Sequence, residues 1–115
     1  MHLETSQQTV ATVVRVAATT LDADSTERFR SAMAEILENA SNVVLDLAHL
    51  EFIDSSGLGA ILSCLRDVAA EGGELKLCGL SGTVRAVFDL ARVHRVLDIH
   101  DGLTEALEAF PDRAA

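Results

Sequence analysis

Apolar residues alternate along the chain between a spacing typical of strands and a spacing typical of helices. Residues 9–17 are rich in valine and threonine, and residues 42–47, 74–78 and 96–99 are short runs dominated by apolar side chains. These short runs rich in β-branched residues and leucine predict four strands. Residues 2–7 can pair with the first of these as a short antiparallel strand.

Four further segments carry apolar residues at helical spacing. The clearest has a stripe three and four residues apart, formed by Phe29, Ala32, Met33, Ile36, Leu37 and Ala40. The second runs over about residues 56–70 and is stopped by Gly72-Gly73, and the last ends at Pro111. Helix caps are predicted at Asp24 (with Glu27 three residues later), Ser81 and Asp101.

Strands that alternate with helices predict βα units and a mostly parallel sheet. In residues 42–47, Val43, Leu45 and Leu47 share one face, while Val44 and Asp46 share the other. Such alternation indicates that helices cover mainly one face. We therefore expect an α/β fold: a mostly parallel sheet of four βα units with an antiparallel N-terminal edge strand and helices mainly on one face. The length of 115 residues predicts a single domain over residues 1–115.

Charge and composition exclude several classes of partner. Eighteen acidic residues against nine Lys and Arg give a net charge of −9, and four Phe are the only aromatic residues. Nucleic-acid binding needs cations and stacking surfaces, and anionic membranes also attract cations. No apolar run is long enough to span a bilayer, and no signal peptide is visible. We expect a cytoplasmic protein that binds neither nucleic acid nor membrane.

The two cysteines, Cys64 and Cys78, are too few for a disulfide framework. They are predicted to be reduced core thiols. A zinc site would need both of them together with His94 or His100, and no closely spaced pair of ligands exists. We expect no metal and no cofactor.

The most informative segment is residues 54–59, DSSGLG, between the second predicted strand and the second predicted helix. Its polar residues can cap the helix, and its small residues let helix and strand approach. Two hydroxyls and two glycines in six residues exceed what a cap needs, and a helix N-terminus favours a phosphate. Ser56 lies nearer the helical stripe and is predicted to serve as the cap, which leaves Ser55 freer to reach a partner.

This hexapeptide resembles the signature of the STAS-domain anti-sigma factor antagonists. The similarity extends to Leu21-Asp22 after the first strand, to residues 43–47 and 72–75, and to residues 84–88 in the third helix, so it covers nearly the whole chain. The resemblance implies a STAS-like fold without catalytic activity that acts as a partner switch. Such proteins bind an anti-sigma factor serine kinase of the histidine-kinase-like ATPase type and release its client sigma factor. The kinase phosphorylates the serine directly after the aspartate, here Ser55, which ends binding, and a PP2C-type phosphatase reverses the modification.

The partner-facing surface is predicted to surround the start of the second helix. Loops that follow parallel strands leave the sheet at one end, so residues 20–25 should lie beside Ser55. Leu58 is a candidate apolar anchor if it is exposed, and a core residue otherwise. The residues expected to contact the partner are Asp22, Asp24, Asp54, Ser56, Gly57 and Leu58.

Two alternatives follow from the same residues. An enzyme would use Ser55 or Ser56 as nucleophile with His49, His94 or His100 as base, but neither a GxSxG elbow nor a P-loop is present. A STAS domain can also be a subunit of a stress-signalling or lipid-transport complex without sigma control, or the regulatory tail of an anion transporter. The neighbouring genes would discriminate these roles.

Overall fold

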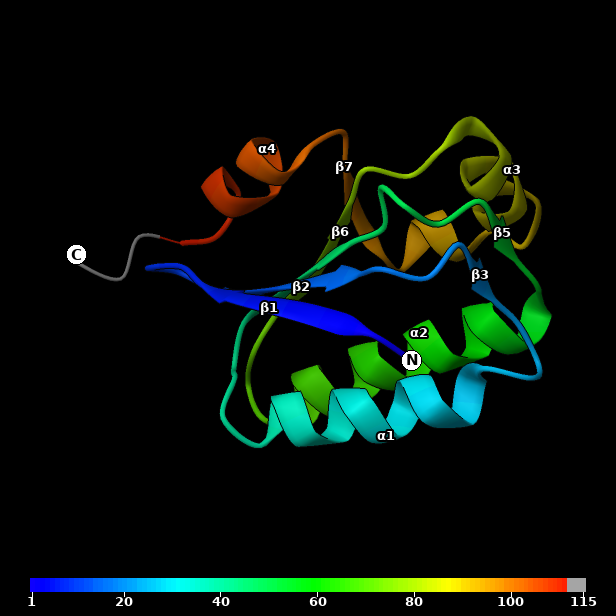
Figure 1. Cartoon of the computed structure of the whole chain (residues 1–115). Helices are drawn as coiled ribbons and strands as arrows, with labels where there is room; N and C mark the ends of the chain where they lie inside the picture. The colour runs from blue at the N-terminus through cyan, green and yellow to red at the C-terminus, as the bar shows by residue number, and fades with distance from the viewer. Residues whose placement is uncertain (112–115) are drawn as a thin grey trace.

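A five-stranded sheet forms the centre of the computed structural model, which describes residues 1–111 (Figure 1). The strand order is β1-β2-β4-β6-β7. β1 pairs antiparallel with β2, and every other neighbouring pair is parallel. The predicted mostly parallel sheet with an antiparallel N-terminal edge strand is therefore confirmed. The strands are β1 (Leu3–Gln7), β2 (Thr12–Val16), β4 (Val43–Asp46), β6 (Leu75–Cys78) and β7 (Asp98–His100).

Two long helices, α1 (Thr26–Leu37) and α2 (Ser55–Ala70), lie side by side along one face of the sheet (Figure 1). α3 (Gly82–Leu90) contributes Val84 and Phe88 to the same core. That core also holds the strand residues predicted to face inward, among them Val43, Leu45 and Leu47, all fully buried. Burial of these side chains provides the main stabilisation of the fold.

The opposite face is covered in part by the short helix α4 (Leu103–Glu108) (Figure 1). A second apolar cluster forms beneath it, made of Ala11, Val13, Val44, Cys78, Ala106 and Phe110. Three of the four helices thus lie on the first face, as expected, but the second face is only partly exposed to solvent. Asp46 and Lys76, which the alternation assigns to it, are only 6% and 4% exposed.

The buried ammonium group of Lys76 is surrounded by favourable partners. It lies 3.4 Å from a Glu74 carboxylate oxygen, donates to Asp98, and sits 4.8 Å from the centre of the Phe110 ring. Burial by itself would raise the pKa of Asp98, but hydrogen bonds from Lys76 and His100 outweigh it and lower that pKa. The sequence pattern could not show these contacts, because the residues that make them are far apart in the chain. Lys76 lies on β6, Asp98 lies on β7, and Phe110 follows α4.

Some predicted element boundaries are wrong. The predicted Asp24 cap is wrong, because the N-cap of α1 is Ser25. Ser25 makes no side-chain cap bond, since its hydroxyl hydrogen-bonds to Asp22 instead. α4 follows Gly102 rather than an Asp101 side-chain cap. A 3₁₀ turn at Val93–Arg95 delays the last strand. The predicted Ser81 cap is confirmed, since its hydroxyl accepts from the Val84 N–H at 3.2 Å.

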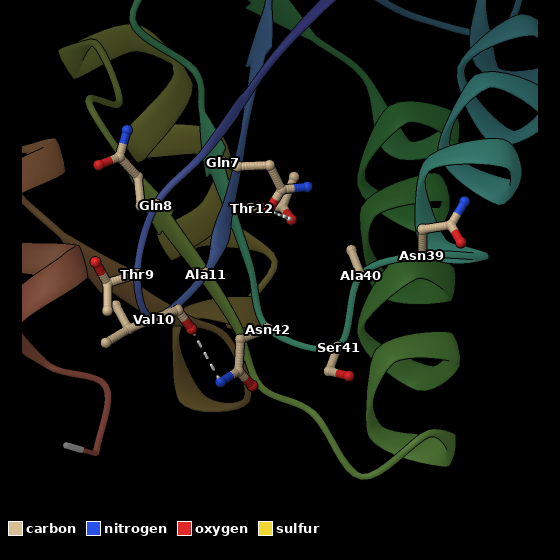
Figure 2. A pocket seen from close by; sticks show the side chains of 10 residues that line it. All are labelled: Gln7, Gln8, Thr9, Val10, Ala11, Thr12, Asn39, Ala40, Ser41 and Asn42. Carbon is tan, nitrogen blue, oxygen red and sulfur yellow. Dashed lines mark hydrogen bonds between the residues drawn. The ribbon is translucent and has the colours of Figure 1, made fainter. Parts of the chain in front are cut away.

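The end of the sheet where α1 finishes holds a small polar cavity of about 190 Å³, between residues 7–12 and 39–42 (Figure 2). Its side chains mainly link chain segments. The Asn42 amide donates to the Val10 carbonyl at 3.2 Å and accepts from the Glu74 N–H at 2.9 Å. The Thr12 hydroxyl donates to the Gln7 side chain at 3.0 Å. These bonds hold the turn between β1 and β2 against the strands that follow.

Within residues 1–111, no helix is both long enough and apolar enough to cross a bilayer.

Candidate functional site

The DSSGLG segment forms the first turns of α2, and Asp54 is its N-cap. The Asp54 carboxylate accepts from the Gly57 N–H at 2.9 Å through Oδ1 and from the Ala23 N–H at 3.1 Å through Oδ2. The prediction that Ser56 serves as the cap is therefore wrong. A carboxylate at this position satisfies a free N–H of the helix and also interacts favourably with the helix dipole.

Two loops that are distant in sequence meet here. β3 (Thr20–Leu21) and β5 (Phe52–Ile53) form a second, two-stranded parallel sheet that the sequence patterns did not predict. The Glu51 N–H donates to the Thr19 carbonyl at 2.7 Å, and the Asp54 N–H donates to the Leu21 carbonyl at 3.3 Å. The expectation that residues 20–25 lie beside the start of the second helix is confirmed.

Gly57 permits the close packing of this junction. A Cβ atom at this position would lie 2.4 Å from the Leu21 carbonyl oxygen and 2.7 Å from Ile53 Cγ1. Both distances are far inside van der Waals contact, so any side chain would push α2 away from the β3–β5 pair. Gly57 itself is buried, and its role within the fold is structural.

The two serines have different surroundings. Ser55 is exposed, whereas Ser56 is half-buried, and within residues 1–111 neither hydroxyl makes a hydrogen bond. Ser56 lines a groove of about 460 Å³ between α1 and α2, which we call the α1–α2 groove. Its lining residues are Ala23, Thr26, Glu27, Arg30, Ser56 and Gly59. Both hydroxyls are accessible for modification, and Ser55 the more so.

The remaining predicted contact residues divide into surface and core. The Asp22 carboxylate accepts from the Asp24 N–H at 3.1 Å and from the Ser25 hydroxyl at 3.2 Å, so it braces its own loop. Asp24 is exposed, and both aspartates line a second groove that is separate from the one containing Ser56. Leu58 is 6% exposed and belongs to the core, so it is not a surface anchor.

Side chains suited to catalysis are not gathered around the serines. Within the described residues, no hydrogen bond joins Ser55 or Ser56 to a histidine, and no group of three or more His, Cys, Asp or Glu could hold a metal ion. Cys64 and Cys78 are buried free thiols, as predicted. Burial raises the pKa of each to about 12, which keeps both thiols protonated and unreactive near neutral pH.

Sequence reasoning missed three contributors to this site. The backbone N–H of Ala23 binds Asp54, and such a contact leaves no signal in residue type. Glu27 and Arg30 face the motif across the α1–α2 groove. Because these two residues are three positions apart in the first predicted helix, the sequence indicates that they share one side of it. Only the structure shows that this side borders α2.

Comparison with known proteins gives a consistent result. The model of the STAS domain family matches residues 2–106. The anti-sigma F factor antagonist of Paenibacillus polymyxa is 32% identical over 89 residues, which are 76% of this chain and 76% of that protein. The crystal structure of an anti-sigma factor antagonist from Mycobacterium paratuberculosis superposes with a TM-score of 0.85 at 20% identity, and the match covers 96% of this chain and 94% of that one. Bacillus SpoIIAA in its phosphorylated form matches with a TM-score of 0.69 at 24% identity, over 93% of this chain and 97% of that one.

Proposed function

The chain belongs to the STAS domain family of anti-sigma factor antagonists, and from this membership we propose that it is a phospho-regulated partner switch. Its unphosphorylated form binds an anti-sigma factor serine kinase of the histidine-kinase-like ATPase type and releases the client sigma factor. Phosphorylation of Ser55 ends that binding, and a PP2C-type phosphatase restores it. The protein works in the cytoplasm as a single binding domain over residues 1–115, without enzymatic activity of its own.

One observation supports Ser55 above all: it is an exposed hydroxyl on the first residue of α2, and Asp54 performs the capping. The fold therefore makes no use of this hydroxyl, so a kinase can modify it without removing a structural contact. SpoIIAA, which shares the fold, exists in an unphosphorylated and a phosphorylated form, and this agrees with such a switch.

Phosphorylation of Ser55 is expected to change the affinity for the partner much more than it changes the stability of the fold. A phosphate on Ser55 gains about 0.3–1 kcal/mol from the N-terminus of α2. Repulsion between this near-dianion and the neighbouring Asp54 carboxylate costs about 1–2 kcal/mol in water. These terms partly offset each other in the free protein. A partner docked over the site would instead bury an uncompensated dianion, which costs several kcal/mol and weakens affinity about a hundredfold or more.

The test uses the unmodified chain, its Ser55→Ala and Ser55→Asp variants, and Ser56→Ala as the matched control. Each is incubated with a purified serine kinase of this type and ATP, and the modified site is mapped by mass spectrometry. We expect phosphate on Ser55, no phosphate on Ser55→Ala, and normal modification of Ser56→Ala. Ser55→Ala should bind the kinase constitutively, and Ser55→Asp should bind it weakly.

Phosphate mapped to Ser56 would reject the assignment of the site. Equal kinase binding by the phosphorylated and unphosphorylated protein would reject the mechanism. A phosphate-independent role would then favour the alternative, a subunit of a stress-signalling or lipid-transport complex without sigma control. A permease and an ATPase encoded beside this chain would support that alternative, whereas a kinase or phosphatase would support the switch.

A further inference from the structure

The two edges of the central sheet differ in how well they are protected from further pairing. β7 is three residues long, carries Asp98 and His100, and is followed by α4. β1 is five residues long, contains neither proline nor lysine, and pairs with β2 in a continuous register without a bulge. Short length, charges, proline, bulges and covering elements are the usual means of preventing another strand from pairing at an edge. Of these, β1 has only the charge of Glu4.

The outer side of β1 is open. Within residues 1–111, β2 is the only element that packs extensively against β1, which forms the outer strand of the sheet (Figure 1). The helix α4 does not reach over it, because an open hollow of about 290 Å³ separates Leu103, at the start of α4, from the exposed β1 residues Glu4, Thr5 and Ser6. A further strand could therefore approach β1 without displacing a part of the fold.

The register of β1 with β2 determines which backbone groups face outward. The Ala17 N–H donates to the carbonyl of His2, one position before β1, at 3.2 Å. In an antiparallel pair, residues that bond to the neighbouring strand alternate with residues that do not. The even-numbered residues of β1 therefore bond to β2, and the odd-numbered ones direct their N–H and carbonyl groups outward. These outward residues are Leu3, Thr5 and Gln7.

The outward groups of β1 are complementary to those of a second copy of the same strand. If two copies pair antiparallel with Thr5 opposite Thr5, then Leu3 lies opposite Gln7, and each of these pairs exchanges two N–H···O bonds. Every outward N–H and carbonyl group of residues 3–7 is then satisfied. On the other face of the strands, Glu4 lies opposite Ser6, so no like charges are directly opposed.

The distribution of charge also favours a second copy at this edge. The net charge of −9 makes most of the molecule repel another copy of itself. Residues 1–21, however, contain one acidic residue, Glu4, and one Lys or Arg, which is Arg15. These two side chains are 3.8 Å apart. The edge is thus close to neutral, so it offers no attraction to a strongly charged partner and little repulsion to a second copy.

We propose that the outer edge of β1 is a homodimerisation surface, on which β1 of a second copy pairs antiparallel with Thr5 at the two-fold axis. The two five-stranded sheets then form one continuous sheet. Because β1 is short, the interface is smaller than the roughly 1,200–2,000 Å² of stable complexes, and dimerisation depends on protein concentration. The pairing uses no residue of the DSSGLG motif, so this inference is independent of the proposed function.

Analytical ultracentrifugation of the full chain measures the dimer directly. We expect the apparent mass to rise from 12.2 kDa toward twice that value between about 10 μM and about 1 mM protein. Thr5→Pro removes an outward N–H but no bond to β2, and proline is tolerated at such positions of an edge strand, so this variant should stay a folded monomer. Thr5→Val keeps the N–H and is the matched control, which should dimerise like the unmodified chain. Circular dichroism verifies that each variant is folded.

A cysteine at the proposed axis provides a second measurement that does not depend on the proline variant. Opposite residues of a hydrogen-bonded antiparallel pair have Cα atoms about 5.5 Å apart, which is within the range for a disulfide. Under air oxidation, Thr5→Cys should form a disulfide-linked dimer at least about tenfold faster than Thr83→Cys, which replaces an exposed threonine on α3. The native thiols Cys64 and Cys78 are buried and should react in neither variant.

Three results would overturn the inference. The first is a monomer at every concentration of the unmodified chain. The second is a folded Thr5→Pro variant that dimerises as well as the unmodified chain, because the dimer would then use another surface. The third is equal cross-linking of Thr5→Cys and Thr83→Cys. None of these results concerns the binding of a kinase, so each would leave the proposed function standing.

Discussion

At the scale of single residues, each polar group of the motif has a separate task. Asp54 holds two backbone N–H groups, one from α2 and one from the loop after β3. Gly57 allows the two segments to touch. Within residues 1–111 the hydroxyl groups of both serines make no hydrogen bonds and are thus available to a partner. The sequence identified all of these residues as candidates but misassigned the cap, because Asp and Ser are nearly equivalent as N-cap residues.

This division of tasks predicts opposite results for two neighbouring substitutions. Asp54→Ala should lower the free energy of unfolding by about 1–2 kcal/mol, because it removes the helix cap and also the acceptor for the Ala23 N–H. Ser56→Ala should change it by less than about 0.5 kcal/mol, because its hydroxyl contacts nothing that the fold needs. Urea unfolding of both variants measures the difference. A larger loss for Ser56→Ala than for Asp54→Ala would contradict the assigned cap.

At the scale of elements, periodicity predicted the long strands and helices well and the short ones poorly. α1 and α2 carry many apolar residues at regular spacing, so their existence follows from the pattern. β3 and β5 are two residues each, too short for any period. They form because two loops are brought together by the main sheet. The apolar residues of α4 are regularly spaced, but this spacing does not indicate which face of the sheet the helix covers.

The contacts that join β6, β7 and the end of α4 are expected to make the stability of the fold depend on pH in the acidic range. Because the folded pKa of Asp98 lies below its unfolded value of 3.8, the folded state binds fewer protons there. Its contribution to stability is present above that unfolded value and is lost as pH falls through the folded pKa. Asp98→Asn cannot titrate and also weakens the pairing of buried Lys76. We expect it to be less stable at pH 7 and to lose less stability than the unmodified chain between about pH 5 and 2.

Chemical unfolding measured at several pH values tests this expectation. Glu74→Gln is a matched control, since Glu74 also contacts Lys76 but at the longer distance of 3.4 Å. Parallel stability curves for Asp98→Asn and the unmodified chain would show that Asp98 does not contribute to the acid response.

At the scale of the whole molecule, the net charge of −9 governs which large partners can approach. We expect no binding to duplex or single-stranded DNA in about 150 mM salt, because too few cations are available to displace phosphate counterions. Fluorescence anisotropy with labelled oligonucleotides measures this directly. A Kd below about 1 μM would contradict the expectation, since non-specific binding at such salt is typically about 10⁻⁴–10⁻⁶ M.

The general fold and the position of the motif could both be predicted from the order of strands and helices along the chain. Strand and helix periods are local, and parallel βα units place all their following loops at one end of the sheet. The α1–α2 groove was not predictable, because it depends on how Arg30 and Gly59, from two helices, face each other. Burial of Lys76 was also hidden, since its partners Asp98 and Phe110 lie 22 and 34 positions further along the chain.

The bond between the Ala23 N–H and Asp54 joins positions 31 residues apart, and the β3–β5 pair beside it is equally non-local. A linear peptide with the hexapeptide would therefore lack the part of this surface that residues 19–23 contribute. A protein that recognises this surface would therefore bind the folded chain and not an unfolded or truncated one, although all of them contain the same hexapeptide.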